Sequence, residues 1–427
     1  MRTRNAVVGG LFDSGFAALA AFAASVYASR VFEVATLGYY SLFLTAFLAG
    51  MTVPGRLLFF PYEVAAVAQP AGQRLTFVRK GMLRAVPLAC GSAIVAAAVA
   101  ALLSSGAGMA VVLPLAASMA LATAVSPLQD HARRVLHVDN RSTQAAVVSV
   151  VQLVGILALI FLLHGGGVDP IWIPYLSLAG ANFMSLSLGV WFIGRAAGGV
   201  SVAPPPFRSV ARSGSWLLYI SLLGPVVGLA VNSLVLGIAG AVALGLAEAA
   251  RQVARPLLVV TTGLGMSLRP RSFAAAQQQR RPAARRIERL AIVVTVGAGL
   301  AYTAWVTIDW PFNIMQDLIP KAYDLPWLVF AVCISNIVVG IGFPSGYELI
   351  GGKKEAAAAV VESVGQAARL ALTAFTAAFG AFTIAASDTG LGLARFVGNR
   401  VAVRSIYEEP TDERPAETAA EVEQHGS

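Results

Sequence analysis

The chain has 427 residues, of which 57% are hydrophobic and only 12% are charged. A soluble domain carries about 25% charged residues, so this composition excludes an ordinary soluble protein and predicts an all-α, polytopic integral membrane protein. The formal net charge of +9 would fit a nucleic-acid-binding protein if the basic residues gathered on one surface. Their distribution along the chain does not fit that class.

Apolar runs long enough to cross a membrane recur through the chain, given that a helical span needs about 20 residues. We expect about twelve transmembrane helices, at 6–29, 35–66, 82–104, 109–132, 143–164, 171–194, 214–237, 241–268, 289–309, 325–350, 356–384 and 388–404. Prolines inside several of these runs predict local kinks. They are Pro54, Pro61, Pro114, Pro225, Pro256 and Pro344.

The basic residues mark alternate loops. All but six of the 31 lysines and arginines fall on the side of the N-terminus when the twelve spans are threaded in order. The exceptions are two residues in outer loops and four inside spans: Arg30, Lys321, Arg56, Arg251, Arg255 and Arg369. By the positive-inside rule we expect cytoplasmic N- and C-termini. The positive charge is therefore topological, and we expect no nucleic-acid partner.

The spans divide into two sets of six. We expect an N-terminal six-helix lobe at 1–197, a cytoplasmic linker at 198–213, a C-terminal six-helix lobe at 214–404 and a disordered acidic cytoplasmic tail at 405–427. Six helices per lobe give the two lobes the same orientation in the membrane. Folds built from such parallel repeats place the substrate path between the lobes.

Short internal matches support a repeat. Residues 145–151 read "AAVVSVV" and residues 358–364 read "AAVVESV". A weaker match joins "ATLGYYSL" at 35–42 to "VALGLAEA" at 242–249, 207 positions later. We therefore expect two parallel repeats related by an axis along the membrane normal.

Residues that would carry enzymatic chemistry are not grouped in the sequence. Cys90 and Cys333 both lie in apolar runs, the four histidines are scattered, and no phosphate-binding loop or nucleophile motif occurs. We therefore expect a protein that is not an enzyme, with no catalytic residue, no metal ion and no cofactor.

The chain contains two sets of six spans and, at 29–50, the segment "SRVFEVATLGYYSLFLTAFLAG". In these features it resembles the polysaccharide flippases of the multidrug/oligosaccharidyl-lipid/polysaccharide exporter superfamily. In that family a short outer loop leads into a Leu-Gly-Tyr-like helix start, here Leu37-Gly38-Tyr39. The second half echoes this passage at 232–257, where Asn232 stands in place of an acidic residue common in the family. The resemblance covers about residues 1–404 and implies two lobes that flip a lipid-linked sugar by alternating access.

Three charges fall within one predicted span, in "LGLAEAARQVARPLL" at 244–258. Each charge at the bilayer centre costs about 2.5–3.5 kcal/mol on insertion scales. Glu248, Arg251 and Arg255 share one helical face, and one carboxylate neutralises only one arginine. Two interpretations stay open. Either the face lines a wet cavity and binds phosphate oxygens of an anionic substrate, or it makes static pairs, Glu248 with Arg251 and Arg255 with Asp13 or a carbonyl.

Other charges lie inside spans and have similar alternatives. Arg56 is about 15 Å from the cytoplasmic end of its helix and either faces the cavity or snorkels to the headgroups. Asp13 is a proton or sodium site or the partner of an arginine. Glu362, Gln366 and Arg369 share a face and contact substrate or one another. The candidate lining of the central cavity comprises Arg56, Arg251, Arg255, Glu248, Asp13 and Arg369.

We therefore expect a multi-pass transporter of the bacterial cytoplasmic (inner) membrane that flips a lipid-linked saccharide for cell-surface polysaccharide export. Its expected partners are a polyprenyl phosphate or pyrophosphate saccharide, membrane lipids, which the basic stretch 269–289 would attract, and other polysaccharide-assembly proteins.

Three alternatives remain open. A drug or organic-cation antiporter of the same superfamily should show a net acidic cavity. A transporter of the other large twelve-span class usually carries a glycine-rich charged loop that is not visible at 69–81. A membrane-embedded glycosyltransferase or polymerase needs acids at the outer face, where Asp309, Asp317 and Asp324 are the candidates.

Overall fold

The structure is a computed structural model that describes residues 2–67, 70, 73–139, 141–196 and 207–408. Over these residues the chain is helical and contains no strand. In chain order the elements are α1 (Arg2–Val31), α2 (Val34–Pro54), η1 (Gly55–Phe59), α3 (Phe60–Val67), α4 (Arg74–Leu103), η2 (Ser105–Ala107), α5 (Met109–Val138), α6 (Ser142–Gly165), α7 (Ile173–Ala196), α8 (Phe207–Gln277), α9 (Arg281–Thr307), α10 (Ile314–Leu318), η3 (Pro320–Asp324), α11 (Pro326–Ile341), α12 (Phe343–Gly351), α13 (Glu355–Leu372), η4 (Thr373–Phe375), α14 (Thr376–Phe379) and α15 (Phe382–Glu408).

These helices make twelve crossings. Nine helices in the described part of the chain are long and apolar enough to span a membrane. The longest of them, Gly214–Gly265, contains two crossings because α8 breaks at Gly240, where φ is 88° and ψ is 169°. Glycine tolerates this positive φ without a steric penalty. The segment from α13 to α14 and helix α15 add the last two crossings. The predicted multi-pass, all-α fold with about twelve spans is confirmed.

The turn before the last crossing lies earlier than predicted. The expected spans 356–384 and 388–404 leave a turn near 385–387, whereas the chain reverses at Gly380, with φ of 52°, and α15 begins at Phe382. Apolar residues on both sides of Gly380 hide this turn from a hydropathy reading. The shift places Asp388 about two turns inside α15 and not at the end of a span.

Two other boundaries also differ from the prediction. Helix α8 begins at Phe207, so residues 207–213 of the expected linker are helical. Helix α15 continues to Glu408, into the expected tail at 405–427. The remainder of both predictions, 198–206 and 409–427, lies outside the described residues.

The proline expected to kink the second span precedes a π-helical turn. Helix α2 ends at Pro54, the five residues Gly55–Phe59 adopt π-helical geometry, and α3 continues the same crossing. Proline removes one backbone donor from the helical ladder, and single π-turns are frequent at functional sites. Arg56 lies in this turn.

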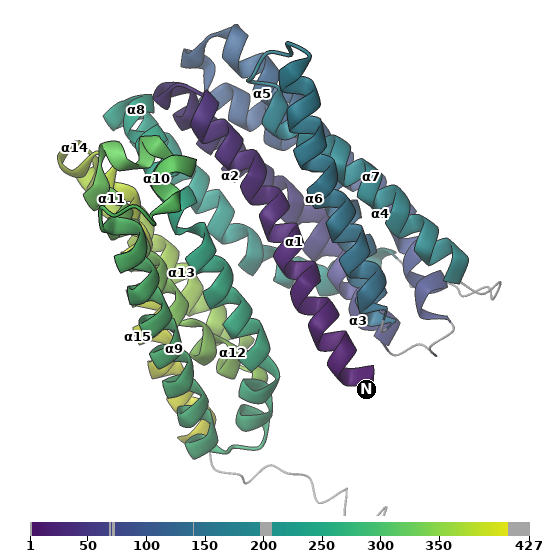
Figure 1. Ribbon diagram of the computed structural model, residues 1–427. Helices are drawn as coiled ribbons and strands as arrows, with labels where there is room; N and C mark the ends of the chain where they lie inside the picture. The colour runs from purple at the N-terminus through teal and green to yellow at the C-terminus, as the bar shows by residue number, and fades with distance from the viewer. Residues whose placement is uncertain (1, 68–69, 71–72, 140, 197–206, 409–427) are drawn as a thin grey trace, which may run out of the picture.

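The helices form two groups, shown purple to teal and green to yellow in Figure 1. In the first group α1 packs on α6, and α5 packs on α4 and α7. In the second group α15 packs on α11 and α13, and α9 packs on α11. The groups meet chiefly where α2 lies along α8. Buried apolar residues on both sides of that contact, among them Leu37, Phe43, Val235 and Ala250, belong to one continuous core.

Two glycines allow α2 and α8 to approach closely. A Cβ added to Gly38 would lie 2.1 Å from the carbonyl oxygen of Ala241, and one added to Gly245 would lie 1.8 Å from that of Val34. Both contacts are too short for any side chain, so the helices cross backbone to backbone. Gly38 and Gly245 are the equivalent positions of the weaker sequence match. The two matched glycines therefore lie against each other's helices, near the start of α2.

A lysine joins the two groups near the end that the charge bias places outside. The Lys321 Nζ on η3 donates to the carbonyl oxygens of Ser29 at 2.9 Å and Arg30 at 3.1 Å, and also to that of Phe32. Carbonyls at a helix C-terminus lack helical partners and favour a cation. Burial lowers the pKa of the Lys321 ammonium. The contact ties the second group of helices to the end of α1.

Candidate functional site

The charged face of α8 lies against α1 and α2. Glu248 is only 2% exposed, and its carboxylate accepts hydrogen bonds from Ser41 Oγ on α2 at 2.9 Å and from Arg255 Nη2 at 3.2 Å. Gln252 Nε2 donates to it at 3.4 Å, and Arg251 Nη1 lies 4.0 Å away. A buried carboxylate needs such partners to remain charged. Glu248 is therefore held in place from both groups of helices.

The same face also contacts α1 directly. Arg255 Nη1 donates to Ser25 Oγ, and Ser29 Oγ donates to Gln252 Oε1. Serine hydroxyls add little bulk, so the two helices lie close enough for these side chains to meet. The residues of this face connect the first six crossings to the last six through polar contacts within the membrane.

A second carboxylate, Asp388 on α15, is shared by two arginines. Its Oδ1 lies 2.8 Å from Arg369 Nη2 and its Oδ2 lies 3.4 Å from Arg251 Nη2. Arg251 also donates to Asn232 Oδ1 at 3.3 Å, and Asn232 Nδ2 donates to Thr45 Oγ1 on α2 at 2.9 Å. The chain of contacts thus runs from α15 through α8 to the first group of helices.

We call these charges the interlobe network: Glu248, Arg251, Arg255, Arg369 and Asp388. Three arginines face two carboxylates, which leaves a formal excess of one positive charge. The long contacts, at 3.4 Å and 4.0 Å, both involve Arg251. Exchanging the partners of Arg251 therefore costs the least interaction energy in the network, because charged hydrogen bonds weaken as they lengthen.

Asp13 belongs to a different cluster, within the first group of helices. It is 3% exposed, and its Oδ2 lies 2.8 Å from both Arg133 Nη1 and His137 Nε2 on α5. Its Oδ1 accepts a hydrogen bond from Ser149 Oγ on α6 at 2.6 Å. Arg133 also contacts Asp130 at 2.7 Å. Every oxygen of the Asp13 carboxylate thus has a polar partner.

Arg56 lines a cavity of about 320 Å³ near the cytoplasmic end of the first group. The cavity is bounded by α2, η1, α3 and α5, and Pro225 on α8 adds a wall from the second group. The Arg56 guanidinium lies 5.7 Å from the centre of the Phe60 ring. Both groups of helices therefore contribute to the surroundings of this arginine.

The acids of this cavity are engaged by other side chains. Asp130 contacts Arg134 Nη2 at 2.6 Å in addition to Arg133, and Glu63 Oε1 lies 2.9 Å from His131 Nδ1. Among the residues that the structure describes, none places a carboxylate within ion-pair distance of Arg56. Arg56 is thus a cation in the membrane region whose charge no described carboxylate pairs at close range.

The structure brings together four of the six residues predicted to line one cavity: Glu248, Arg251, Arg255 and Arg369. Arg255 pairs with Glu248 and not with Asp13, which the static-pair interpretation had offered as one of its partners. Asp13 and Arg56 lie in two other places. Arg369 joins the network through Asp388, whereas Glu362 pairs with Arg395 at 2.5 Å.

Sequence reasoning missed Asp388, whose carboxylate accepts hydrogen bonds from two of the candidate arginines. Its expected position at the end of a span would place its carboxylate near the lipid headgroups, where acidic residues are common. The signal that would have found it is Gly380, since a helix break there moves Asp388 inward. Arg133 and His137, the partners of Asp13, were treated as loop and scattered residues although α5 continues to Val138.

The fold matches solved transporter structures. An inward-facing multidrug resistance MATE family transporter of the MOP superfamily gives a TM-score of 0.67 at 13% identity, covering 92% of this chain and 96% of that chain. A MOP superfamily transporter from Pyrococcus furiosus, described as having a binding pocket of reversed polarity, gives 0.64 at 12% identity and covers 96% of each chain. A MATE transporter from Vibrio cholerae gives 0.61 at 13% identity, covering 96% of this chain and 99% of that chain.

No protein-family model and no curated protein matches the sequence. At these identities the structural matches establish the fold alone. The chain therefore has the twelve-helix fold of MATE transporters and is a multi-pass membrane protein.

Proposed function

We propose that this protein is a flippase of the MOP superfamily that moves a lipid-linked saccharide across the bacterial cytoplasmic membrane by alternating access. The observation that carries the proposal is Arg56, a cation in the membrane region without an ion pair among the described residues. An unpaired charge there is too costly to keep unless it faces water or an anion. A substrate phosphate or pyrophosphate supplies such an anion.

The surroundings of Arg56 suit an anionic group. Arg134 lines the same cavity, and of the two acids nearby Asp130 is paired with arginines and Glu63 contacts His131. The guanidinium fork binds phosphate oxygens through two parallel hydrogen bonds. The cavity has walls from both groups of helices, so an anion bound there senses their relative position.

The transport cycle follows from these contacts. Arg56 captures the phosphate at the cytoplasmic end, while the lipid tail stays beside the helices. Arg251, with its long contacts to Asp388 and Glu248, exchanges a protein carboxylate for the substrate phosphate as the lobes rock. Arg56, Arg251 and Arg255, which the sequence predicted to line one cavity, would therefore engage the phosphate in stages, because Arg56 lies apart from the other two in this conformation. No covalent step is involved.

A second candidate is a drug or organic-cation antiporter, favoured by the multidrug resistance transporters of the same fold. The interlobe network argues against it, because an excess of arginine over carboxylate repels a cation. The Pyrococcus furiosus protein supports the idea that this fold hosts pockets of more than one polarity. Substrate class is thus decided by charge and not by fold.

The test compares Arg56→Ala with wild type in liposomes that contain a polyprenyl-pyrophosphate saccharide. We expect binding and transbilayer movement to fall at least tenfold in Arg56→Ala, with partial recovery in Arg56→Lys, which keeps the charge but not the fork. Arg195→Ala is a matched control, because Arg195 also stacks on an aromatic ring, Trp191, at 5.5 Å. Equal loss in both variants would contradict the assignment of Arg56.

A further inference from the structure

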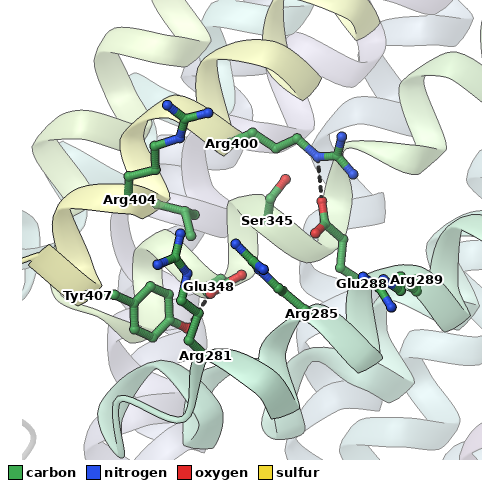
Figure 2. A pocket seen from close by; sticks show the side chains of 10 residues that line it. Arg281, Arg285, Glu288, Arg289, Ser345, Glu348, Arg400, Arg404 and Tyr407 are labelled. Atoms are coloured by element: carbon green, nitrogen blue, oxygen red, sulfur yellow. Dashed lines mark hydrogen bonds and ion pairs between the residues drawn. The ribbon is translucent and has the colours of Figure 1, made fainter.

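A second basic cavity lies at the cytoplasmic end of the C-terminal group of helices. It has a volume of about 290 Å³ and is formed by α9, α12 and α15. Figure 2 shows arginine side chains from α9 and α15 on opposite sides of it, around Ser345 and Glu348 of α12. Its lining comes from the last crossings alone, so it is separate from the Arg56 cavity and from the interlobe network.

The arginines form two facing rows. Arg281, Arg285 and Arg289 are spaced four residues apart on α9, and Arg400 and Arg404 have the same spacing on α15. Residues four apart on a helix are neighbours on one face, and like charges at this spacing repel. Two such rows directed at one cavity are unfavourable for the protein alone and become favourable when an anion lies between them.

The acids in the cavity do not neutralise these rows. Glu288 Oε1 accepts from Arg400 Nε at 2.8 Å, whereas Glu348 accepts a hydrogen bond from the Tyr407 hydroxyl. Five arginines therefore face two carboxylates. Among the described residues, Arg285, Arg289 and Arg404 have no carboxylate within ion-pair distance, and these three guanidinium groups remain available to a ligand.

The backbone adds to the attraction. Helix α9 begins at Arg281, so the positive end of its dipole lies beside the cavity. A neighbouring hollow of about 430 Å³ is lined by Arg281, Pro282, Arg285, Arg286 and Arg289. The α9 row can therefore be reached from the surface as well as from the cavity.

We propose that this cavity, between the arginine rows of α9 and α15, is a binding site for the phosphate group of an anionic ligand. Arg285 and Arg404 face it from opposite sides and would hold the phosphate oxygens through their guanidinium forks. Two sources supply this chemistry at the cytoplasmic membrane surface: the headgroup of an anionic phospholipid and a free phosphate compound. The proposal concerns a site on one lobe and holds whether or not the transport proposal is correct.

The test uses the full chain in uncharged detergent, with thermal unfolding and direct binding as readouts. One arm adds phosphatidylglycerol or phosphatidylcholine to the detergent micelles, and the other adds inorganic phosphate or pyrophosphate. The variant is Arg285→Gln with Arg404→Gln. The control, Arg195→Gln with Arg212→Gln, removes the same charge from exposed arginines outside the cavity. Arg285→Lys with Arg404→Lys keeps the charge if the glutamine pair unfolds.

We expect phosphatidylglycerol to raise the melting temperature of the wild type and the control, and phosphatidylcholine to leave it unchanged. The affinity should fall at least tenfold in the glutamine pair and by less in the lysine pair. Binding in the lipid arm alone identifies a headgroup site, and binding in both arms identifies a site for phosphate in general. Equal affinity in wild type and both cavity pairs, or equal loss in the control, would overturn the proposal.

Discussion

Replacing Asp388 by alanine should be among the most damaging single changes within the membrane. The substitution leaves Arg369 and Arg251 without their shared carboxylate, at contacts of 2.8 Å and 3.4 Å. Breaking a buried ion pair by removing one partner costs about 3–5 kcal/mol. Arg369 keeps only the Gly224 carbonyl, at 3.3 Å, and Arg251 keeps Asn232 and the more distant carboxylate of Glu248, at 4.0 Å. Since the Asp388 side chain is 19% exposed, we expect the lower end, about 3 kcal/mol.

The assay is unfolding by a denaturing detergent titrated into mixed micelles, with Asp317→Ala as the control. Asp317 is exposed in the outer loop, and its removal should change stability by less than about 0.5 kcal/mol. Combining Asp388→Ala with Arg369→Ala should cost less than the sum of the single changes, by about 1–3 kcal/mol. Two results would refute the pairing of Asp388 with Arg369. One is that the losses of stability in the single variants add up in the double variant. The other is that Asp388→Ala loses no more stability than the control.

Three further predictions test other parts of the structure. Lys321→Met should lower the free energy of unfolding by about 1.5–3 kcal/mol, because the contact between η3 and the end of α1 is lost. Spin labels on these two segments should then report a longer distance between them. An unchanged distance would refute the contact. Gly245→Ala should lower the free energy of unfolding by about 1–3 kcal/mol, because the added methyl group overpacks the helix contact. Gly237→Ala should leave it unchanged, because Gly237 has open space around it. Equal melting temperatures of the two variants would show that α2 and α8 are not in backbone contact. Asp13→Asn removes the charge opposite Arg133 and His137 and should lower stability by about 1–3 kcal/mol without shifting the pH profile of transport; a shifted profile would instead assign Asp13 to ion coupling.

The sequence predicted the fold closely because hydropathy and charge asymmetry are properties of whole segments. Twelve spans and the all-helical class follow from runs of apolar residues. The glycines of the weaker repeat match, Gly38 and Gly245, lie where α2 and α8 meet, although the match predicted a repeat and not a contact. Apolar runs of this kind can be recognised without knowing which helices become neighbours.

The pairing of buried charges was harder to predict, since it depends on which helices lie side by side. The sequence placed Glu248, Arg251 and Arg255 on one face, but only the packing of α1, α2 and α15 supplies their partners Ser25, Ser41 and Asp388. A single misplaced turn, at Gly380, was enough to hide Asp388. Arg56 was correctly expected inside a span, but its lack of an ion pair depends on the three-dimensional positions of Asp130 and Glu63.

The most direct test of the proposed function is the identity of the transported molecule. Wild-type protein in liposomes should move a fluorescent polyprenyl-pyrophosphate saccharide between leaflets, faster than protein-free liposomes and faster than the Arg56→Ala variant. It should not accumulate a fluorescent organic cation under a proton or sodium gradient. Uptake of the cation without movement of the saccharide would contradict the flippase proposal and would make the antiporter the function of this protein.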